Sequence, residues 1–262
     1  MSEDAALRLA GTYRRCVNAS LARIWENVFD WEHLAHLHDG SFADCVLLDD
    51  GPWGWRVTLT PVGGAAQVVE LRADRTNQRY TSTTIDGPGA GTQIRVALTP
   101  RAARTVDVLV EFHLPETRPD RLAALGEAYA AIYARLWDED EAMMQARERA
   151  LAQRSRSGGT TPPLDLGDSA AVRESLPLVF EMGGAPFRLI DFDGRLIAHS
   201  TICPHWLGPL DEVSVINGKV RCPWHGYRFD VIGGTCAEHP KLKLAFAPTI
   251  RVVDGRVIAG DV

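Results

Sequence analysis

The chain has 262 residues, of which 45% are hydrophobic and 24% are charged, a composition typical of a globular protein with room for two modest cores. Its net charge is −6, because 28 Lys and Arg face 34 Asp and Glu, and the sequence contains no basic tract. Neither nucleic acid nor an anionic membrane is therefore expected as a partner.

The first part of the chain predicts a helix, several strands and then a second, long helix. The first helix is expected over about Leu21 to Leu37, after Ser20, a residue type that caps helix N-termini. The long helix is expected from about Pro119 to Ala152. Between the helices, alternating strand patterns lie at residues 55–59, 67–71, 93–98 and 106–112. An antiparallel sheet on one long helix is an α+β fold that can enclose an apolar cavity.

A stretch rich in Gly, Ser and Pro divides the chain into two predicted domains, 1–153 and 168–262, joined by a linker at 154–167. In the second domain, turn-forming dipeptides separate short apolar runs, which predicts an all-β structure. These dipeptides are at 183–184, 193–194, 217–218, 233–234 and 254–255.

No apolar run approaches the roughly 20 residues needed to cross a bilayer, and the polar start lacks the pattern of a signal peptide. The predicted location is the cytoplasm. Of the five cysteines, two have a metal-binding spacing. The others, Cys16, Cys45 and Cys236, are expected to be free thiols, which fits a reducing compartment.

Two short motifs, Cys203-x-His205 and Cys222-x-x-His225, each lie beside a predicted hairpin. Two thiolates can ligate one iron of a [2Fe-2S] cluster while two imidazoles ligate the other. A structural zinc site takes the same ligand types. Zinc fingers, however, provide a Cys pair followed by a His pair, whereas each loop here provides one of each. We therefore predict a [2Fe-2S] cluster.

The segments Cys203-Pro-His-Trp-Leu-Gly-Pro-Leu210 and Cys222-Pro-Trp-His-Gly-Tyr-Arg-Phe-Asp230 resemble Rieske ferredoxins and the Rieske domains of ring-hydroxylating oxygenases. Respiratory Rieske proteins join these loops by a disulfide, and Pro209 and Trp224 stand at the corresponding positions here. Phe229 stands where those proteins place a Tyr that hydrogen-bonds near the cluster, which implies a lower potential. The resemblance favours an oxygenase or ferredoxin over a quinol oxidase.

A second constellation lies between Asn27 and His38, with the spacing Asn-x2-Asp30-x2-His33-x4-His38. It resembles the motif with which Rieske oxygenases bind mononuclear iron, which implies that His33 and His38 are ligands and that Asp30 carries the electron from the cluster. On a regular helix, a separation of five residues turns about 140°, so these histidines meet only if the helix breaks. His36 remains an alternative, because it lies one helical turn after His33. A row of surface histidines is the other interpretation.

A facial triad of two histidines and one carboxylate needs a further acid. Asp140 falls on the apolar stripe of the predicted long helix, whereas Asp138 and Glu141 are expected to point away. A buried carboxylate is costly unless a cation pairs with it. The surrounding acidic run also resembles the oxygenase segment that ligates iron, with Glu139 as the alternative ligand. A solvated acidic helix face is the competing interpretation.

The resemblance implies a Rieske non-haem iron oxygenase in reversed domain order, with a START-type (helix-grip) domain before the Rieske domain. Such an enzyme uses Fe(II) and O2 to hydroxylate or demethylate a small apolar or aromatic substrate, here with Trp53 and Trp55 as expected pocket walls. The sequence has no Gly-rich dinucleotide motif, so a separate NAD(P)H-dependent reductase or ferredoxin is expected. The resemblance also implies a homo-oligomer, such as a trimer.

The alternative function is a non-catalytic electron carrier or redox sensor, in which a START-like domain binds an apolar ligand and no second iron is present. The short first domain favours this alternative, and the density of Asp and His residues in it favours the oxygenase. The missing disulfide and the absence of a membrane anchor argue against a respiratory subunit.

Overall fold

The computed structural model describes residues 7–116, 118–154 and 161–260. The chain divides into two compact units, Met1–Gln145 and Ala146–Val262, which are described separately. Within the described residues, no helix combines the length and the apolar character needed to cross a membrane.

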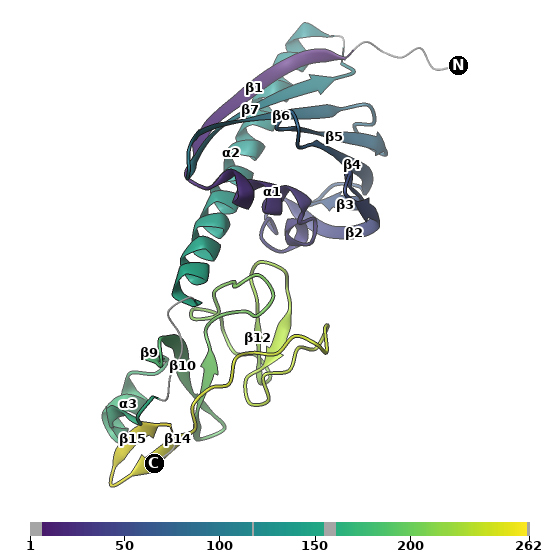
Figure 1. The fold of residues 1–262 in the computed structure, drawn as a ribbon. Coiled ribbons are helices and arrows are strands. Elements are labelled where there is room, and N and C mark those ends of the chain that lie inside the picture. The colour runs from purple at the N-terminus through teal and green to yellow at the C-terminus, as the bar shows by residue number, and fades with distance from the viewer. Residues whose placement is uncertain (1–6, 117, 155–160, 261–262) are drawn as a thin grey trace. The chain divides into compact units, whose positions relative to one another are not determined.

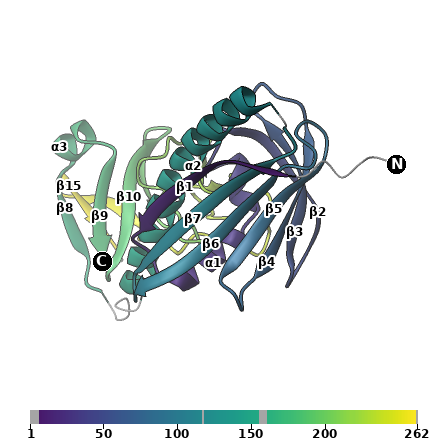
Figure 2. The same ribbon diagram turned by 90° about the horizontal axis from the view of Figure 1, so that it is seen from above.

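The first unit is a seven-stranded antiparallel sheet that curves around a long helix, α2 (Figures 1 and 2). The strand order is β1-β7-β6-β5-β4-β3-β2. The strands are β1 (Arg8–Val17), β2 (Phe42–Gly51), β3 (Gly54–Pro61), β4 (Gln67–Asp74), β5 (Arg79–Asp86), β6 (Gln93–Ala102) and β7 (Thr105–Leu114). The predicted α+β class is confirmed, and so are the four predicted strands, which belong to β3, β4, β6 and β7.

The helix α2 (Pro119–Arg154) packs on the sheet through aromatic side chains. The ring of Phe112, a buried residue of β7, lies 5.5 Å from that of Tyr129 and 5.3 Å from that of Tyr133. The helix also comes very close to β1, because a Cβ atom on Gly126 would lie 2.2 Å from the carbonyl oxygen of Ala10. Glycine at this position therefore lets α2 lie directly on the sheet.

The first predicted helix is shorter than expected and breaks after nine residues. The helix α1 (Leu21–Phe29) begins as predicted at Ser20, whose Oγ accepts a hydrogen bond of 3.3 Å from the amide of Arg23. It ends at Asp30, where the backbone leaves the helical region, and a short 3-10 helix, η1 (Glu32–Ala35), follows. The prediction of one helix up to Leu37 was therefore wrong, since the chain continues through turns to the start of β2.

The carboxylate of Glu141 on α2 is buried, which corrects the prediction that it points away from the core. It accepts hydrogen bonds of 2.8 and 3.0 Å from the backbone and side-chain nitrogens of Asn18, and one of 2.9 Å from Nε of Arg15. Asp138 is exposed as predicted. Through these hydrogen bonds, Glu141 links the segment before α1 to α2. Asp140 is the residue directly before Glu141 on this helix.

The second unit consists of small antiparallel sheets. One contains β9 (Leu178–Met182), β10 (Ala185–Phe192) and β11 (Arg195–Ser200), and another contains β8 (Leu164–Asp168), β14 (Ile250–Val253) and β15 (Arg256–Ala259). The third pairs β12 (Lys219–Arg221) with β13 (Arg228–Asp230). All five predicted dipeptides lie in turns, and at three of them an Asp or Asn before the Gly has a positive φ, as tight hairpin turns require.

A short helix, α3 (Ser169–Glu174), was not predicted. It begins at Asp168, whose side chain accepts hydrogen bonds from the amides of Ala170 and Ala171, so an N-cap signal was present in the sequence. Residues 155–160 of the expected linker lie outside the described residues. The end of that linker, however, forms strand β8, because Leu164 and Leu166 pack on the core of the second unit. The domain boundaries predicted from the sequence, at residues 153 and 168, stay a prediction.

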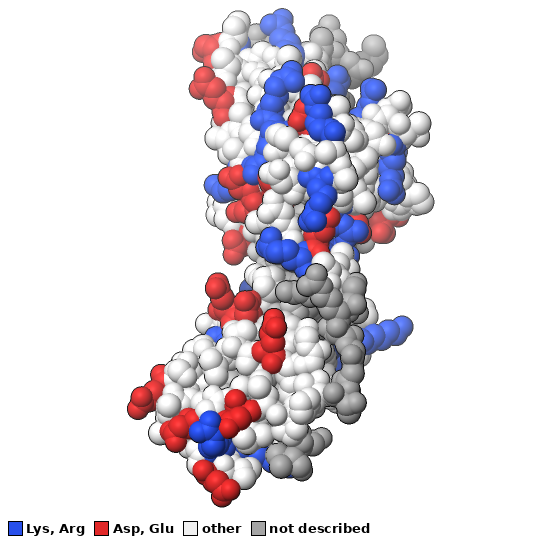
Figure 3. Space-filling model, turned by 60° about the vertical axis from the view of Figure 1, so that its left-hand side comes forward, with Lys and Arg blue, Asp and Glu red and all other residues white. Residues whose placement is uncertain are grey.

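Charged residues of both signs lie on the surface of each unit in the view of Figure 3. Ion pairs of the first unit include that between Glu70 and Arg72 on β4, 2.5 Å apart.

Replacing Glu141 by Gln should lower the free energy of unfolding by about 1–3 kcal/mol at pH 7, because a charged hydrogen-bond acceptor is lost. Burial raises the pKa of Glu141, but hydrogen bonds from Asn18 and Arg15 outweigh burial and hold it below the ordinary value of 4.5. Such a carboxylate contributes stability above pH 4.5 and loses the contribution as pH falls through its folded pKa. Urea denaturation at pH 7 and pH 3 measures the difference, which should shrink in acid.

The matched control is Glu127→Gln, which removes an exposed carboxylate from the same helix. It should change the free energy of unfolding by less than about 0.5 kcal/mol. An effect of Glu141→Gln that is equal at both pH values would contradict the assigned role of the ionised carboxylate.

Candidate functional site

The first unit brings two histidines and one aspartate together. His33 lies on η1, His38 in the turns that follow it and Asp140 on α2, and their donor atoms all lie within 4.8 Å of one another. Oδ1 of Asp140 is 3.4 Å from Nε2 of His33 and 3.2 Å from Nε2 of His38. All three side chains are buried, with relative exposures of 4%, 1% and 8%. The structure thus brings together the three residues that the sequence singled out as ligands, and their binding of iron stays a prediction.

The break in the helix after Phe29 makes this convergence possible. His38 leaves the helical path, and its carbonyl oxygen accepts hydrogen bonds of 2.8 and 2.9 Å from the amides of Ser41 and Phe42, which lead into β2. The two imidazole rings lie 5.0 Å apart at an angle of 74°. His36, the alternative ligand, is only half-buried and does not belong to the group.

Each imidazole has a second carboxylate on its other nitrogen. Oδ2 of Asp30 lies 3.4 Å from Nδ1 of His33, and Oε2 of Glu139 lies 2.5 Å from Nδ1 of His38. Glu139, the alternative third ligand, therefore lies behind His38. Carboxylates in such positions hold a proton on Nδ1 and leave the lone pair of Nε2 for a metal.

Asn27 belongs to the same group, because its Nδ2 donates a hydrogen bond of 2.9 Å to Oδ1 of Asp140. Asn27 lies on α1 and is buried, with a relative exposure of 6%. The amide therefore fixes the orientation of the carboxylate from a second element of the fold.

The electrostatics of the group are dominated by Asp140. Burial lowers the pKa of His33, but Asp140 and Asp30 outweigh burial and raise it to about 10. Burial likewise raises the pKa of Asp140, and the two histidines reverse this effect and hold it well below its usual range. Without a metal, His33 is thus protonated beside an ionised carboxylate, and a metal cation bound here would take the place of that proton. Two imidazoles and one carboxylate are a donor set that fits non-haem Fe(II).

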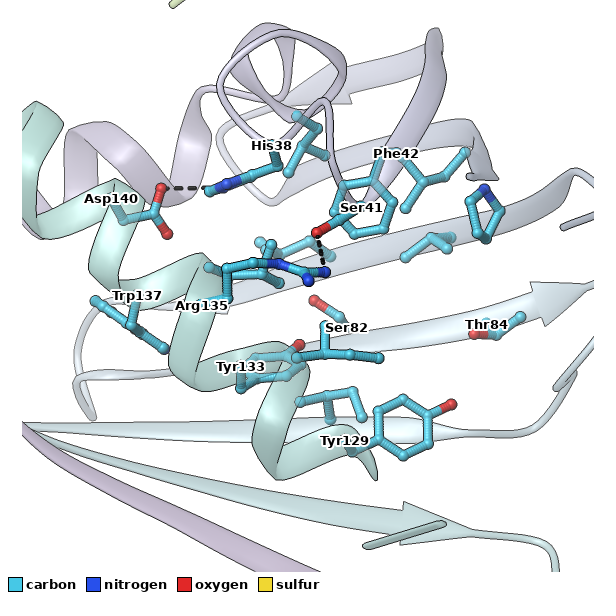
Figure 4. A pocket seen from close by; sticks show the side chains of 18 of the residues that line it. His38, Ser41, Phe42, Ser82, Thr84, Tyr129, Tyr133, Arg135, Trp137 and Asp140 are labelled. Carbon is cyan, nitrogen blue, oxygen red and sulfur yellow. Dashed lines mark hydrogen bonds and ion pairs between the residues drawn. The ribbon is translucent and has the colours of Figure 1, made fainter. Parts of the chain in front are cut away.

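A cavity of about 640 Å³ lies beside this group in the first unit (Figure 4). Trp55 lines it, as predicted, and its Nε1 donates a hydrogen bond of 2.8 Å to the carbonyl oxygen of Val28. Trp53 does not line the cavity, which corrects its predicted role; the guanidinium of Arg72 lies over its ring at 5.1 Å. Asp30, His33, His38 and Asp140 all lie in the cavity wall, so a molecule in the cavity can reach them.

The sequence did not point to several polar residues of this cavity. Arg135 and Ser41 were missed, although Arg135 lies next to the predicted stripe of α2 and Ser41 is the third residue after His38. The remaining hydroxyl groups come from Ser82, Thr84, Thr92, Tyr80, Tyr129 and Tyr133. For the residues on strands, a Ser or Thr in the sequence does not reveal whether its side chain will face a cavity or the solvent.

The second unit brings the four predicted cluster ligands into two neighbouring loops. The two loops share one backbone pattern: the amide of the fourth residue after each cysteine donates to the carbonyl oxygen of that cysteine. This residue is Leu207 in the first loop and Gly226 in the second, and both have a positive φ. Cys203 and Cys222 are buried, and the rings of His205 and His225 lie 4.6 Å apart.

The two loops pack against each other at Gly208. A Cβ atom on this residue would lie 2.8 Å from Sγ of Cys222 and 3.1 Å from the ring of Trp224. Trp224 is buried beside Gly208. Within the same unit, the guanidinium of Arg147 lies 4.4 Å from the ring centroid of Trp206, and its Nη1 donates to the carbonyl oxygen of Trp206 at 3.0 Å.

Residues 163–249 match the family described as "Rieske [2Fe-2S] domain". The C-terminal part of this chain is a Rieske domain. The match includes both cluster loops, and a Rieske domain implies a [2Fe-2S] cluster and a role in electron transfer. The zinc interpretation is thereby set aside.

The curated relatives of the chain match it over short segments. The oxygenase component of dicamba O-demethylase from Stenotrophomonas maltophilia is 44% identical over 48 residues, which cover 18% of this chain and 14% of the relative. Apoptosis-inducing factor 3 from Mus musculus is 36% identical over 62 residues, or 24% of this chain and 10% of the relative. The chain therefore matches only about a tenth to a seventh of the length of these proteins.

Solved structures resemble each part of the chain at low sequence identity. The ferredoxin of carbazole 1,9a-dioxygenase from Nocardioides aromaticivorans IC177 is 19% identical, with a TM-score of 0.32 over 37% of this chain and 96% of that chain. The Zhui aromatase/cyclase from Streptomyces sp. R1128 is 13% identical, with a TM-score of 0.46 over 55% of this chain and 98% of that chain. These likenesses assign no activity to the chain.

The buried thiols of the Rieske domain are arranged for cluster binding. The hydrogen bond between the two thiols lowers the pKa of Cys222 and raises that of Cys203, so Cys222 becomes a thiolate first. Cys236 is also buried, but its Sγ lies 3.6 Å from Oε2 of Glu238, in a different loop. Cys203 and Cys222 are thus the pair that the Rieske motif assigns to one iron of the cluster, with His205 and His225 on the other.

Replacing Cys222 by Ser should abolish the visible absorption and the EPR signal of the cluster, because a thiolate ligand of its iron is lost. Cys236→Ser is the matched control, since it removes a buried thiol from a neighbouring loop and should leave both signals unchanged. Loss of the cluster in both variants to the same extent would contradict the ligand assignment.

Proposed function

We propose that the chain is a Rieske-type non-haem iron oxygenase, in which a START-type catalytic unit precedes the Rieske domain. The observation that carries this proposal is the buried convergence of His33, His38 and Asp140 in the wall of a large cavity. A pocket that only binds an apolar ligand has no need for two imidazoles and an ionised carboxylate, because burying them is costly. In a chain with a Rieske domain, these residues are best explained as ligands of a mononuclear iron.

Iron held by His33, His38 and Asp140 would supply the activation of O2 and the oxidation of a substrate C–H bond, with hydroxylation or demethylation as the result. The chain's own residues prepare that site. Glu139 keeps the proton of the His38 imidazole on Nδ1. Asp30 lies 3.4 Å from Nδ1 of His33 and supplies a negative charge there. We further assign to Asp30 the link through which an electron from the cluster reaches His33.

The cavity walls favour a small apolar or aromatic substrate. Aliphatic and aromatic side chains from β3, β4, β6 and α2 line most of it and exclude water from the reacting position. Together with residues of α1, η1 and β2, the apolar lining residues include Val28, Leu34, Phe42, Trp55, Leu59, Val62, Val69, Leu71, Ile94, Leu125, Ile132, Leu136 and Trp137. Their shape positions the substrate beside the three donor residues.

The proposed reaction consumes electrons that this chain does not draw from NAD(P)H itself. We infer a separate NAD(P)H-dependent reductase or ferredoxin that reduces the cluster bound by Cys203, His205, Cys222 and His225. A homo-oligomer, such as a trimer, allows the cluster of one chain to serve the iron of its neighbour, and electron transfer within one chain is the other arrangement.

The second candidate is an electron carrier or redox sensor whose cavity binds an apolar ligand without a second iron. One observation favours it: protonated His33 and ionised Asp140 compensate each other's charge without a metal. The two functions differ in the number of iron atoms that the chain holds.

Anaerobically purified wild-type protein, reconstituted with Fe(II), should contain about three iron atoms per chain, two in the cluster and one mononuclear. His33→Ala and Asp140→Asn should each lower this number by about one, because each removes a ligand of the mononuclear site. The Rieske EPR signal should stay unchanged. Metal analysis and EPR on the same samples make the measurement.

Asp138→Asn is the matched control, because Asp138 lies on the same helix with an exposed side chain and should leave the iron content unchanged. Wild-type protein that holds only cluster iron after reconstitution would contradict the oxygenase and support the carrier.

A further inference from the structure

The cavity wall carries one feature that the oxygen chemistry does not use. Among the described residues that line the cavity, Arg135 is the only Lys or Arg. Its guanidinium lies against Ser41, and Nη2 donates a hydrogen bond of 2.8 Å to Oγ of Ser41 (Figure 4). A fixed positive charge thus faces a space whose walls are otherwise mostly apolar.

Within the described part of the chain, no carboxylate pairs with this guanidinium. The four acidic residues that follow it on α2 interact with other groups: Asp138 and Glu141 with Arg15, Glu139 with His38, and Asp140 with Asn27 and the two histidines. An arginine has five N–H donors, and the bond to Ser41 uses one of them. Arg135 therefore keeps most of its hydrogen-bonding capacity for a molecule in the cavity.

We propose that Arg135 and Ser41 form an anion-binding subsite, and that the ligand of the cavity is an apolar, aromatic-sized molecule that carries one carboxylate. The planar guanidinium fork matches a carboxylate in a bidentate pair, which a neutral molecule cannot form. The hydroxyl of Ser41 accepts a hydrogen bond from the guanidinium of Arg135 and so helps to position it. This hydroxyl can also rotate to donate its own proton to an oxygen of the bound carboxylate. That the ligand is also the substrate rests on the proposed oxygenase function, whereas the anion binding does not.

The position of the subsite sets the size of the ligand. Arg135 and Asp140 are five residues apart on α2, which is a rise of about 7.5 Å and a turn of about 140° around the helix. Arg135, Ser41, His38 and Asp140 nevertheless all line the same cavity. A ligand held by its carboxylate at Arg135 must therefore extend across at least this rise to reach His38 and Asp140.

The size of the expected preference follows from the strength of charged hydrogen bonds. Such bonds are about twice as strong as neutral ones, and Arg135 is exposed enough for water to replace a missing partner. We therefore expect a carboxylate to bind roughly 2-fold to 5-fold more tightly than a neutral amide of the same shape.

The test measures binding to the full-length protein with its cluster, by isothermal titration calorimetry. The probes are two matched pairs, benzoate with benzamide and 2-naphthoate with 2-naphthamide. In the wild type, at least one carboxylate should bind at least about twofold more tightly than its amide. Arg135→Gln should reduce this ratio to about one, and Ser41→Ala should give a ratio between that of the wild type and one.

Arg95→Gln is the matched control, because Arg95 is an exposed arginine outside the cavity whose guanidinium donates to Oε1 of Gln93. This variant should keep the full preference. Thermal unfolding of every variant verifies that the fold is intact. Equal affinities for carboxylate and amide in both pairs, or a preference that survives in Arg135→Gln, would overturn the proposal.

Asp140→Asn separates this proposal from the proposed function. A preference that disappears in Asp140→Asn but persists in Arg135→Gln means that the carboxylate binds the metal, which overturns the anion subsite and supports the iron site. A preference that depends on Arg135 in a protein with only cluster iron upholds the subsite and overturns the oxygenase.

Discussion

The first unit depends on one buried carboxylate, that of Asp140. An ionised group with a relative exposure of 8% is costly unless its charge is met, and here two imidazoles and one amide meet it. To bring them there, α1 has to end at Phe29, so that His33 and His38 reach the carboxylate from η1 and from the turns after it. The neighbouring Glu141 then ties the start of that segment to α2.

The same arrangement explains which parts of the site were visible in the sequence. Asp140 was predicted from its place on an apolar helical stripe, and His33 and His38 from a motif spacing. Regular helical geometry, by contrast, cannot show where a helix breaks, so the convergence of the histidines depended on the resemblance. Glu141 was misplaced because its partners lie more than 120 residues away in the sequence. Arg135 gave no signal, since an arginine beside a stripe is typical of any solvated helix.

Local signals predicted the rest of the fold unevenly. The strand β7 alternates buried and partly exposed residues over its whole length and was predicted, whereas β1, β2 and β5 carry polar side chains on both faces and were not. The Rieske loops were the clearest case, because the spacing of two Cys and His pairs identifies them without knowledge of the surrounding fold. Trp53 was misassigned because it lies in the turn between β2 and β3, where the alternation of strand faces does not apply.

The account joins a Rieske cluster in one unit to a mononuclear iron in the other, and the location of that iron is its central claim. Anomalous diffraction at the iron absorption edge, from crystals of Fe(II)-reconstituted protein, measures the location directly. The account predicts an anomalous peak among Nε2 of His33, Nε2 of His38 and a carboxylate oxygen of Asp140, in addition to the signal at the cluster loops. Signal at the cluster loops alone, with His33 hydrogen-bonded to Asp140, would contradict it.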